Sequence, residues 1–407
     1  MKLNRRALLA AAASTTVTGR LARAQTQTIK IGVLNDQSGT YRDATGPTSV
    51  ICTRQAIEEF APELKGFNVE VLVADHKNRP DLAATFAKQW IDREGVVLIQ
   101  DGGASSCALL LASICRERNI VFLSTSTATS ALTGEACSPN TVHWVYDTWA
   151  LAQSTGTSTV KSGGDSWFFI SADYTFGHIL EHDTAEFVLA AGGKVLGNLS
   201  YPFPETTDFS AQLLRAQASG AKVLGLANAG TDTFNCVKQA HEFGLHKTMK
   251  IAALLGTINE VHGLGLEVAQ GLRLSEAFYW DLNDRTRAFA KRVTPKTGAI
   301  WPNMSQAGQY SSMMHYLKTV TDMGPAEAVK DGASTVARMK KIPTDDDAFG
   351  RGRIREDGRK IHPFYLFEAK KPEESKHSWD LLKLVATTPA EEAFRPLDRD
   401  HCSFAKA

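Results

Sequence analysis

The feature that most constrains this chain is a repeated alternation of short β-rich runs with helical runs, starting at residue 29. Residues 29–34 predict a strand, which is followed by a polar loop and by a helix from about Pro47. The same unit recurs through strands at residues 67–74, 96–99 and 120–123. This alternation is typical of a parallel sheet with crossover helices, so we predict an α/β fold.

A second series of the same kind follows, with strands predicted at residues 167–171, 194–200, 223–227 and 251–255. Beyond residue 276 the pattern becomes helical, with helices predicted at residues 284–293, 305–323 and 326–339. Residues 364–367 and 379–385 are β-rich again and predict a late hairpin. We therefore predict two Rossmann-like lobes with parallel central sheets, joined by three crossovers. Residues 25–147 with 277–360 would form the first lobe, and residues 148–276 with 361–407 the second lobe and the C-terminal tail.

Size and charge exclude several classes of protein. A chain of 407 residues with 43% hydrophobic residues is long enough for two or three globular domains. Residues 1–24 hold five basic side chains and no acidic one, so the remaining 383 residues carry 40 basic and 44 acidic groups, a net charge of −4. A basic field for nucleic acid is therefore absent, and we predict no nucleic-acid partner.

The amino terminus has the form of an export signal. Arg5 and Arg6 precede a mildly apolar stretch, and Ala22-Arg23-Ala24 offers a small-x-small cleavage site. We predict that residues 1–24 are a signal peptide of either the twin-arginine or the Sec type.

Export to an oxidising compartment changes how the six cysteines are interpreted. Four of them fall on predicted apolar faces and are expected to be small buried thiols: Cys52, Cys107, Cys115 and Cys236. Cys137 and Cys402 lie in predicted loops instead. If one disulfide forms, we predict that it joins Cys137 to Cys402 and tethers the tail.

Two loops at the carboxyl ends of neighbouring predicted strands are rich in glycine and hydroxyl side chains. Residues 101–106 read Asp-Gly-Gly-Ala-Ser-Ser and open a helix, and residues 124–130 read Ser-Thr-Ser-Thr-Ala-Thr-Ser. Ligands of open α/β sheets bind beyond such strand ends, where backbone N–H groups at a helix start suit an anion such as a carboxylate. The alternative is that Ser106, and Thr129 or Ser130, only cap their helices.

Taken in order along the chain, these features resemble the leucine-type periplasmic binding proteins of ABC transporters. The resemblance is carried by the signal, residues 29–34, both hydroxyl-rich loops, residues 172–177 (Ala-Asp-Tyr-Thr-Phe-Gly), and the ending at residues 357–359 and 364–367. It implies a type I fold whose two lobes close over a small ligand in the periplasm and deliver it to an inner-membrane ABC permease. It also implies a monomer that is not an enzyme.

The resemblance places ligand contacts at specific positions. In the first lobe it implies carboxylate contacts from Ser105 or Ser106 and from Ser126, Thr127 and Ala128, with Tyr41 approaching from the first loop. In the second lobe it implies Tyr174, the turn with Asn228 and Gly230, and Thr257 in the loop after Leu255. Tyr279 is a further candidate that could stack on a ligand ring, although residues 278–280 could equally be core at a crossover.

The expected ligand is a small carboxylate, aromatic or aliphatic. Amino-acid binders of the family place an acid just after the last of these strands, whereas residues 256–259 read Gly-Thr-Ile-Asn and the nearest acid is Glu260. Because a buried ammonium without a counter-charge is costly, a ligand without an ammonium group is favoured. Residues 141–147 and 373–376 resemble the aromatic-acid subgroup. A branched-chain or other amino acid is the alternative ligand.

One enzyme motif competes with the receptor hypothesis. His178 and His182 stand one helical turn apart next to Glu181, as in the inverted zinc-protease pattern, and could belong to a zinc-dependent hydrolase. No downstream third ligand has a supporting spacing, and neither a nucleophile-elbow motif nor a phosphate loop occurs in the sequence. We therefore predict no cofactor and no catalysis.

Overall fold

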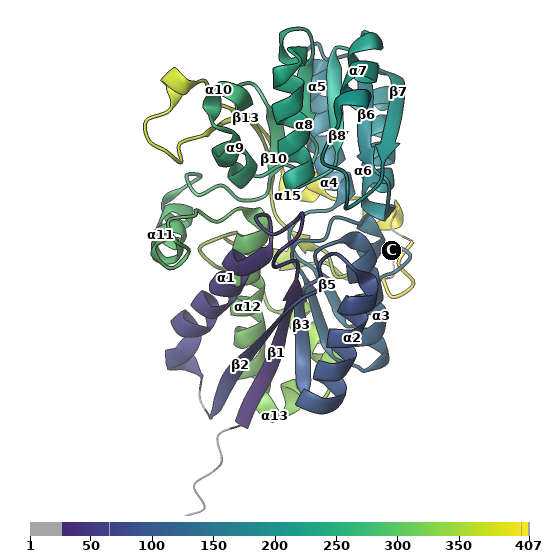
Figure 1. Cartoon of the computed structure of the whole chain (residues 1–407). Helices are drawn as coiled ribbons and strands as arrows, with labels where there is room; N and C mark the ends of the chain where they lie inside the picture. Colours follow the sequence, from purple (N-terminus) through teal and green to yellow (C-terminus); the bar gives the residue numbers. More distant parts are fainter. Residues whose placement is uncertain (1–26, 65, 400, 406–407) are drawn as a thin grey trace, which may run out of the picture.

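The computed structural model describes residues 27–64, 66–399 and 401–405, which form two large sheets flanked by helices and one small two-stranded sheet (Figure 1). The predicted export signal at residues 1–24 lies outside the described residues. Among the described helices, none combines the length and the hydropathy needed to cross a membrane.

The first lobe is built on a parallel five-stranded sheet in the order β2-β1-β3-β4-β5. Its central strands are apolar on both faces, since Ile31 and Leu98 are fully buried, as expected for a parallel sheet covered by helices. The strands are β1 (Gln27–Asn35), β2 (Phe67–Asp75), β3 (Val96–Asp101), β4 (Val121–Ser124) and β5 (Thr141–His143). The helices are α1 (Gly46–Phe60), α2 (Pro80–Gln89), α3 (Ser105–Glu117), α11 (Asp284–Val293), α12 (Met304–Met323), α13 (Pro325–Ala328) and α14 (Gly332–Lys341), with the small hairpin β11 (Arg353–Ile354) and β12 (Lys360–Ile361).

The second lobe is built on a seven-stranded sheet in the order β14-β13-β10-β9-β8-β6-β7, in which β13 and β14 run antiparallel to their neighbours. The strands are β6 (Ser166–Ala172), β7 (Lys194–Tyr201), β8 (Val223–Ala227), β9 (Lys250–Ala253), β10 (Arg273–Glu276), β13 (Phe364–Ala369) and β14 (Leu382–Thr388). The helices are α4 (Thr148–Ala152), α5 (Ser158–Lys161), α6 (Thr175–Ala190), α7 (Ser210–Ala218), α8 (Thr231–Glu242), α9 (Ile258–Leu264) and α10 (Leu266–Ala269). The short α15 (Ala390–Ala393) follows β14.

The strand and helix predictions agree in kind with this architecture, although the second hairpin strand spans Leu382–Thr388 rather than residues 379–385, and β5, β11 and β12 were not predicted. The helix predicted over residues 326–339 is divided into α13 and α14. Asp331 separates the two helices. Its carboxylate accepts a hydrogen bond from the Ser334 N–H at 3.0 Å and so caps the start of α14. The late hairpin is confirmed as β13 and β14.

Three connections pass between the two lobes within the described residues: after β5, after β10, and between β12 and β13. The first and third lie side by side, because the His362 ring bonds the carbonyl of Val145 at 2.7 Å. Arg359 reinforces this contact, since its guanidinium donates to the Tyr146 carbonyl at 3.3 Å and pairs with Asp147 at 3.5 Å. The crossovers hold the carboxyl ends of the two sheets facing each other.

The structure contains the disulfide between Cys137 and Cys402, whose Cα atoms are 5.6 Å apart. The other four cysteines are buried free thiols, as their apolar surroundings in the sequence indicate.

Candidate ligand-binding site

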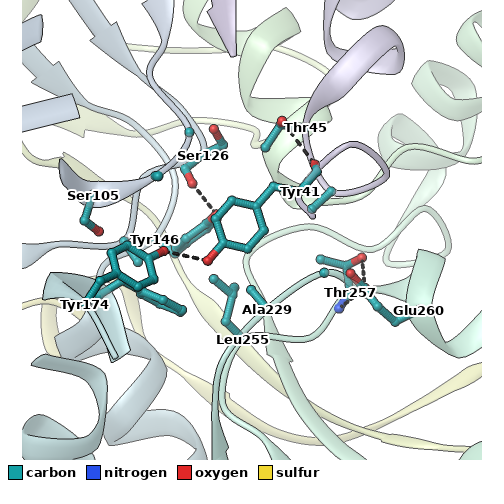
Figure 2. Close-up of a pocket in the computed structure, with 16 residues that line it drawn as sticks. Tyr41, Thr45, Ser105, Ser126, Tyr146, Tyr174, Ala229, Leu255, Thr257 and Glu260 are labelled. Atoms are coloured by element: carbon teal, nitrogen blue, oxygen red, sulfur yellow. Dashed lines mark hydrogen bonds between the residues drawn. The ribbon is translucent and has the colours of Figure 1, made fainter. Parts of the chain in front are cut away.

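A cavity lies between the lobes, lined by the loops that follow strands of both sheets (Figure 2). The space inside it that a water-sized sphere can enter is about 20 Å³, room for about one water molecule, so a larger ligand enters only when the lobes move apart. Its lining residues are Tyr41, Ala44, Thr45, Gly103, Ala104, Ser105, Ser126, Ala128, Tyr146, Tyr174, Phe176, Ala229, Gly230, Leu255, Thr257 and Glu260.

A glycine turn after β3 aims the start of helix α3 at this cavity. Gly102 and Gly103 have φ values of +101° and +56°, which side chains rarely adopt. A Cβ on Gly103 would also stand 2.9 Å from the ring of His76. Helix α3 then begins at Ser105 without a side-chain cap. Its first N–H groups therefore lack the usual partner and form a site that favours an anion.

Ser105 is the most informative side chain of the site. Its residue is only 2% exposed, and its Oγ has no hydrogen-bond partner among the described residues. Leaving a buried hydroxyl unpaired costs about 1–3 kcal/mol. Because Ser105 lines the cavity, the missing partner is expected to come from a bound molecule.

A buried carboxyl group supports the neighbouring loop. Asp101 accepts hydrogen bonds from the hydroxyl of Ser126, from Gln309 and from Asn35, the last at 2.7 Å. Burial raises the pKa of Asp101 to about 6, against the lowering effect of these hydrogen bonds. The hydroxyl proton of Ser126 is thus committed to Asp101, while the Ser126 carbonyl accepts from the Tyr146 hydroxyl at 2.6 Å.

Two tyrosines from opposite lobes meet across the cavity. The hydroxyl groups of Tyr41 and Tyr174 are 2.5 Å apart and point toward each other in Figure 2. Phe203 stacks on both rings, with centroid distances of 5.4 Å to Tyr41 and 4.4 Å to Tyr174. The Thr231 N–H also donates to the Thr40 carbonyl at 3.1 Å, so the lobes are closed on each other in this structure.

Glu260 is the one charged residue among the lining residues that the structure describes. Its carboxylate accepts from the N–H of Thr257 at 2.8 Å and also bonds the Thr257 hydroxyl, completing the capping box of α9. Burial raises the pKa of Glu260 to about 7. Figure 2 places Ser105 and Glu260 on opposite sides of the tyrosine pair.

The cavity brings together seven of the predicted contact residues and leaves four outside its lining. The seven are Tyr41, Ser105, Ser126, Ala128, Tyr174, Gly230 and Thr257. Outside the lining are Ser106, Thr127, Asn228 and Tyr279. The Thr127 hydroxyl donates to the Gly103 carbonyl at 2.9 Å, and the Asn228 amide oxygen accepts from Thr233 at 2.8 Å.

Tyr279 belongs to the packed core rather than to the cavity wall. It is 5% exposed, and its ring lies 5.2 Å from that of Phe367 on β13. Its neighbours Phe278 and Trp280 are buried as well, so the core alternative describes residues 278–280. The capping alternative holds for Thr129, whose hydroxyl accepts from the Ala131 N–H, whereas Ser106 does not cap α3.

Several lining residues were missed by the sequence analysis, among them Tyr146, Phe176 and Glu260. Phe176 stands two residues after Tyr174 and could have been included with it. Glu260 was noted only as the nearest acid. The Thr-x-x-Glu spacing of Thr257 and Glu260 is a capping-box signal. In a capping box the Glu side chain turns back to the N–H of the Thr, which here predicts that the Glu260 carboxyl group lies at the end of the preceding strand.

The histidine pair does not form a metal centre with its surroundings. His178 and His182 are largely exposed on α6, and His178 bonds Asp173 at 2.9 Å. Across the described residues, no group of three or more His, Cys, Asp or Glu side chains is arranged to hold a metal ion. The third ligand that a zinc hydrolase needs is therefore not supplied by the described residues around this pair.

Comparisons with known proteins give a consistent result. A family model described as "Periplasmic binding protein" matches residues 28–376. The structure of a periplasmic binding protein from Burkholderia mallei is 44% identical, covers 94% of this chain and 100% of its own, and superposes with a TM-score of 0.88. No curated protein matches the chain.

Two further solved structures are similar. A branched chain amino acid ABC transporter periplasmic ligand-binding protein from Burkholderia xenovorans LB400 is 35% identical, with a TM-score of 0.81 and coverage of 92% of this chain and 99% of its own. A solute binding protein of an ABC transporter from R. palustris, in complex with 4-hydroxybenzoate, shares the fold at 21% identity, a TM-score of 0.80 and coverage of 90% and 99%. From the family match and these identities, we conclude that the chain belongs to the periplasmic binding protein family, whose members bind substrates and are not enzymes.

Proposed function

We propose that this protein is the exported receptor of an ABC importer and that its two lobes close over a small aromatic carboxylate. The observation that carries the proposal is the unpaired Ser105 hydroxyl beside the uncapped start of α3. Lysine and arginine are absent from the described lining, so hydroxyl and backbone N–H donors would bind the carboxylate. Such donors recognise an anion without the desolvation cost of burying a cation.

The aromatic part of the proposal rests on the rings that line the cavity. Tyr41, Tyr146, Tyr174 and Phe176 line the space between the lobes, and their rings offer faces on which a flat ligand ring can stack once the lobes move apart to admit it. The Tyr41–Tyr174 hydroxyl pair occupies the centre of this space, and we expect the ligand to separate it. Fold relatives in complex with benzoate and with 4-hydroxybenzoate are consistent with this ligand class.

An amino acid is the second candidate, and one observation favours it. Glu260 lies in the cavity and, once ionised, could pair with a ligand ammonium group. The 35% identical relative from Burkholderia xenovorans is described as a branched-chain amino acid binding protein. Against this candidate, Glu260 already bonds Thr257, and its pKa of about 7 leaves it largely protonated below neutral pH.

Binding measurements on the mature protein separate the two candidates. The protein is unfolded, dialysed and refolded to remove any carried ligand, and benzoate, 4-hydroxybenzoate, leucine and phenylalanine are titrated by calorimetry. We expect heat and a thermal shift with the benzoates, since a ligand at 100 times its Kd adds about 2.7 kcal/mol of stability. Binding of leucine but not of benzoate would refute the aromatic assignment.

The variant Glu260→Gln provides a second discrimination. Removing this carboxyl group should leave benzoate affinity equal or higher, because a potential negative charge is lost. The same change should lower the affinity for an amino acid by at least tenfold, because the buried ammonium group of the ligand loses its counter-charge.

The proposed partners follow from the family. We propose delivery to an inner-membrane ABC permease, export by a twin-arginine or Sec signal at residues 1–24, and a monomeric receptor. Light scattering coupled to size exclusion tests the monomer, and a single species near twice the chain mass would contradict it.

A further inference from the structure

Two buried carboxyl groups meet at the start of helix α9, and only one of them belongs to the cavity lining. Glu260 lines the cavity (Figure 2), whereas Glu276, the last residue of β10, is fully buried and lies outside that lining. Glu260 accepts from the Thr257 N–H at 2.8 Å, and Glu276 accepts from the next amide group, the Ile258 N–H, also at 2.8 Å. Because they bind consecutive amide groups, the two carboxyl groups repel each other when both are ionised.

An ionised Glu260 would conflict with the anion that the cavity is proposed to bind. The described lining contains no lysine or arginine that could offset a second negative charge. Burial raises the pKa of Glu260 to about 7, and a proton on this carboxyl group removes the conflict. Where that proton stays depends on Glu276, because two neighbouring buried carboxyl groups titrate as a pair and tolerate one charge far better than two.

The contacts of Glu276 favour its ionised form. Its two oxygens accept from different N–H groups, Oε1 from Ile258 and Oε2 from Met304 at 3.2 Å. Hydrogen bonds to a charged acceptor are about twice as strong as those to a neutral one, so a proton on either oxygen would weaken one of the two. Met304 is also the first residue of α12, a helix of 20 residues whose N-terminus stabilises negative charge.

The contacts of Glu260 leave an oxygen for the proton. Both donors of Thr257, its N–H and its hydroxyl, bond to Oε2 of Glu260. A proton on Oε1 therefore takes neither bond away. Burial raises the pKa of both carboxyl groups, so burial alone does not choose between them. The hydrogen bonds do choose, because they favour the charge on Glu276 and the proton on Glu260.

Other ionisable groups around the pair do not take over the role of Glu276. Asp43 of the first loop also raises the pKa of Glu260, but its side chain is 61% exposed, so solvent and salt screen its charge. The Tyr146 phenol, in the first crossover, stays neutral because burial raises its pKa well above its ordinary value. His262, on α9 itself, stacks on a tryptophan ring with centroids 3.9 Å apart. Within the described part of the chain, no lysine, arginine or histidine bonds either carboxyl group.

We infer that Glu276 carries the negative charge of this pair and thereby keeps the proton on Glu260. Glu276 is a positioning residue, since it lies outside the lining and acts through Glu260. A neutral Glu260 lets the cavity accept a carboxylate and leaves an ammonium group without a counter-charge, so the pair favours an acid over an amino acid. This consequence for the ligand rests on the proposed function, whereas the place of the proton does not.

Infrared spectroscopy locates the proton in the ligand-free protein, because a protonated carboxyl group absorbs apart from a carboxylate. The difference between the wild type and Glu260→Gln isolates the band of Glu260. We expect this band to disappear as pH rises through about 7. In Glu276→Gln, compared with the double variant Glu260→Gln/Glu276→Gln, it should disappear at least about 1 pH unit lower, the lower end of the effect of a neighbouring charge.

Asp43→Asn is the matched control, because it removes an exposed carboxylate near the same group and should move the Glu260 band less than Glu276→Gln does. Equal movement in the two variants would overturn the inference. So would a protonated band at pH below about 7 that persists in Glu260→Gln, because the proton would then lie on Glu276. This last comparison decides the question even if Glu276→Gln does not fold.

Calorimetry with benzoate and leucine tests the consequence for the ligand. In Glu276→Gln at pH 7, benzoate affinity should be about fivefold lower, because the neutral fraction of Glu260 falls from about one half to about one tenth, and leucine affinity should rise. The double variant should bind benzoate as Glu260→Gln does. An equal fall in the double variant would mean that Glu276 acts through packing and would overturn the inference. The expected infrared result without any benzoate binding would support the proton assignment and reject the proposed ligand instead.

Discussion

Ser105→Ala should make the ligand-free protein more stable and should lower its affinity for the ligand. The hydroxyl is buried, unpaired and in the cavity wall, so the folded protein carries a penalty of about 1–3 kcal/mol that alanine removes. With a carboxylate bound, the same hydroxyl donates to a charged acceptor, a bond of about 1.5–3 kcal/mol. Its loss corresponds to an affinity about 10 to 150 times lower.

Urea unfolding of the ligand-free protein and calorimetric titration with benzoate measure the two effects separately. Thr127→Val is the matched control, because Thr127 is equally buried in the neighbouring loop but donates to the Gly103 carbonyl. That variant should lose about 1–2 kcal/mol of unfolding free energy, since it strands a buried acceptor. If Ser105→Ala destabilises the free protein as much as Thr127→Val does, or binds benzoate as the wild type does, Ser105 is not a ligand donor.

Three further predictions follow from the closed cavity. Benzoate affinity should fall as pH rises through about 7, because Glu260 then ionises in the same cavity as the bound anion, and calorimetry should show a smaller fall in Glu260→Gln. Tyr174→Phe removes the hydroxyl contact with Tyr41 and should enlarge the ligand-free radius of gyration in scattering, with benzoate affinity equal or higher because the ligand no longer has to break this contact; an unchanged radius would contradict a role in closure. Gly230→Ala places a Cβ 2.2 Å from the Thr40 carbonyl and should reduce affinity more than tenfold in the same titration, whereas Gly220→Ala, also at positive φ but in open space, should not.

The pH prediction has a counterpart in stability. The folded-state pKa of Glu260 is raised from 4.5 to about 7, so the folded protein binds its proton more tightly than the unfolded chain does. The stability from this group is complete below about pH 4.5 and is lost as pH rises through about 7. Urea unfolding across this range should show that loss in the wild type and less of it in Glu260→Gln.

Much of the architecture was predictable because it follows from local sequence. Strands of a parallel sheet are buried on both faces, so β8 is a short continuous apolar run and β1 contains one at residues 31–34. The glycine turn at residues 102–103 was equally visible, because few other residues accept its positive φ values. The disulfide could be proposed because only two cysteines fell in predicted loops.

The roles of individual side chains in the site were less predictable. Ser105 and Ser126 both line the cavity, but the hydroxyl of Ser126 donates a hydrogen bond to Asp101, whereas that of Ser105 has no partner among the described residues. Tyr174 and Tyr279 both follow strands of the second sheet, yet Tyr279 packs on β13, which lies nearly 90 residues further along the chain. Partners from distant segments decided each of these outcomes.

By itself, then, the sequence determined the two α/β lobes, the strand ends that face each other and the loops that supply hydroxyl groups. Only the tertiary structure decided that the Ser105 hydroxyl lacks a partner among the described residues, where Glu260 lies and that the chain after β14 returns to the first lobe, where Cys402 joins Cys137. The reason is physical: periodicity and turn chemistry act over a few residues, whereas hydrogen-bond pairing and burial depend on groups brought together from hundreds of residues apart.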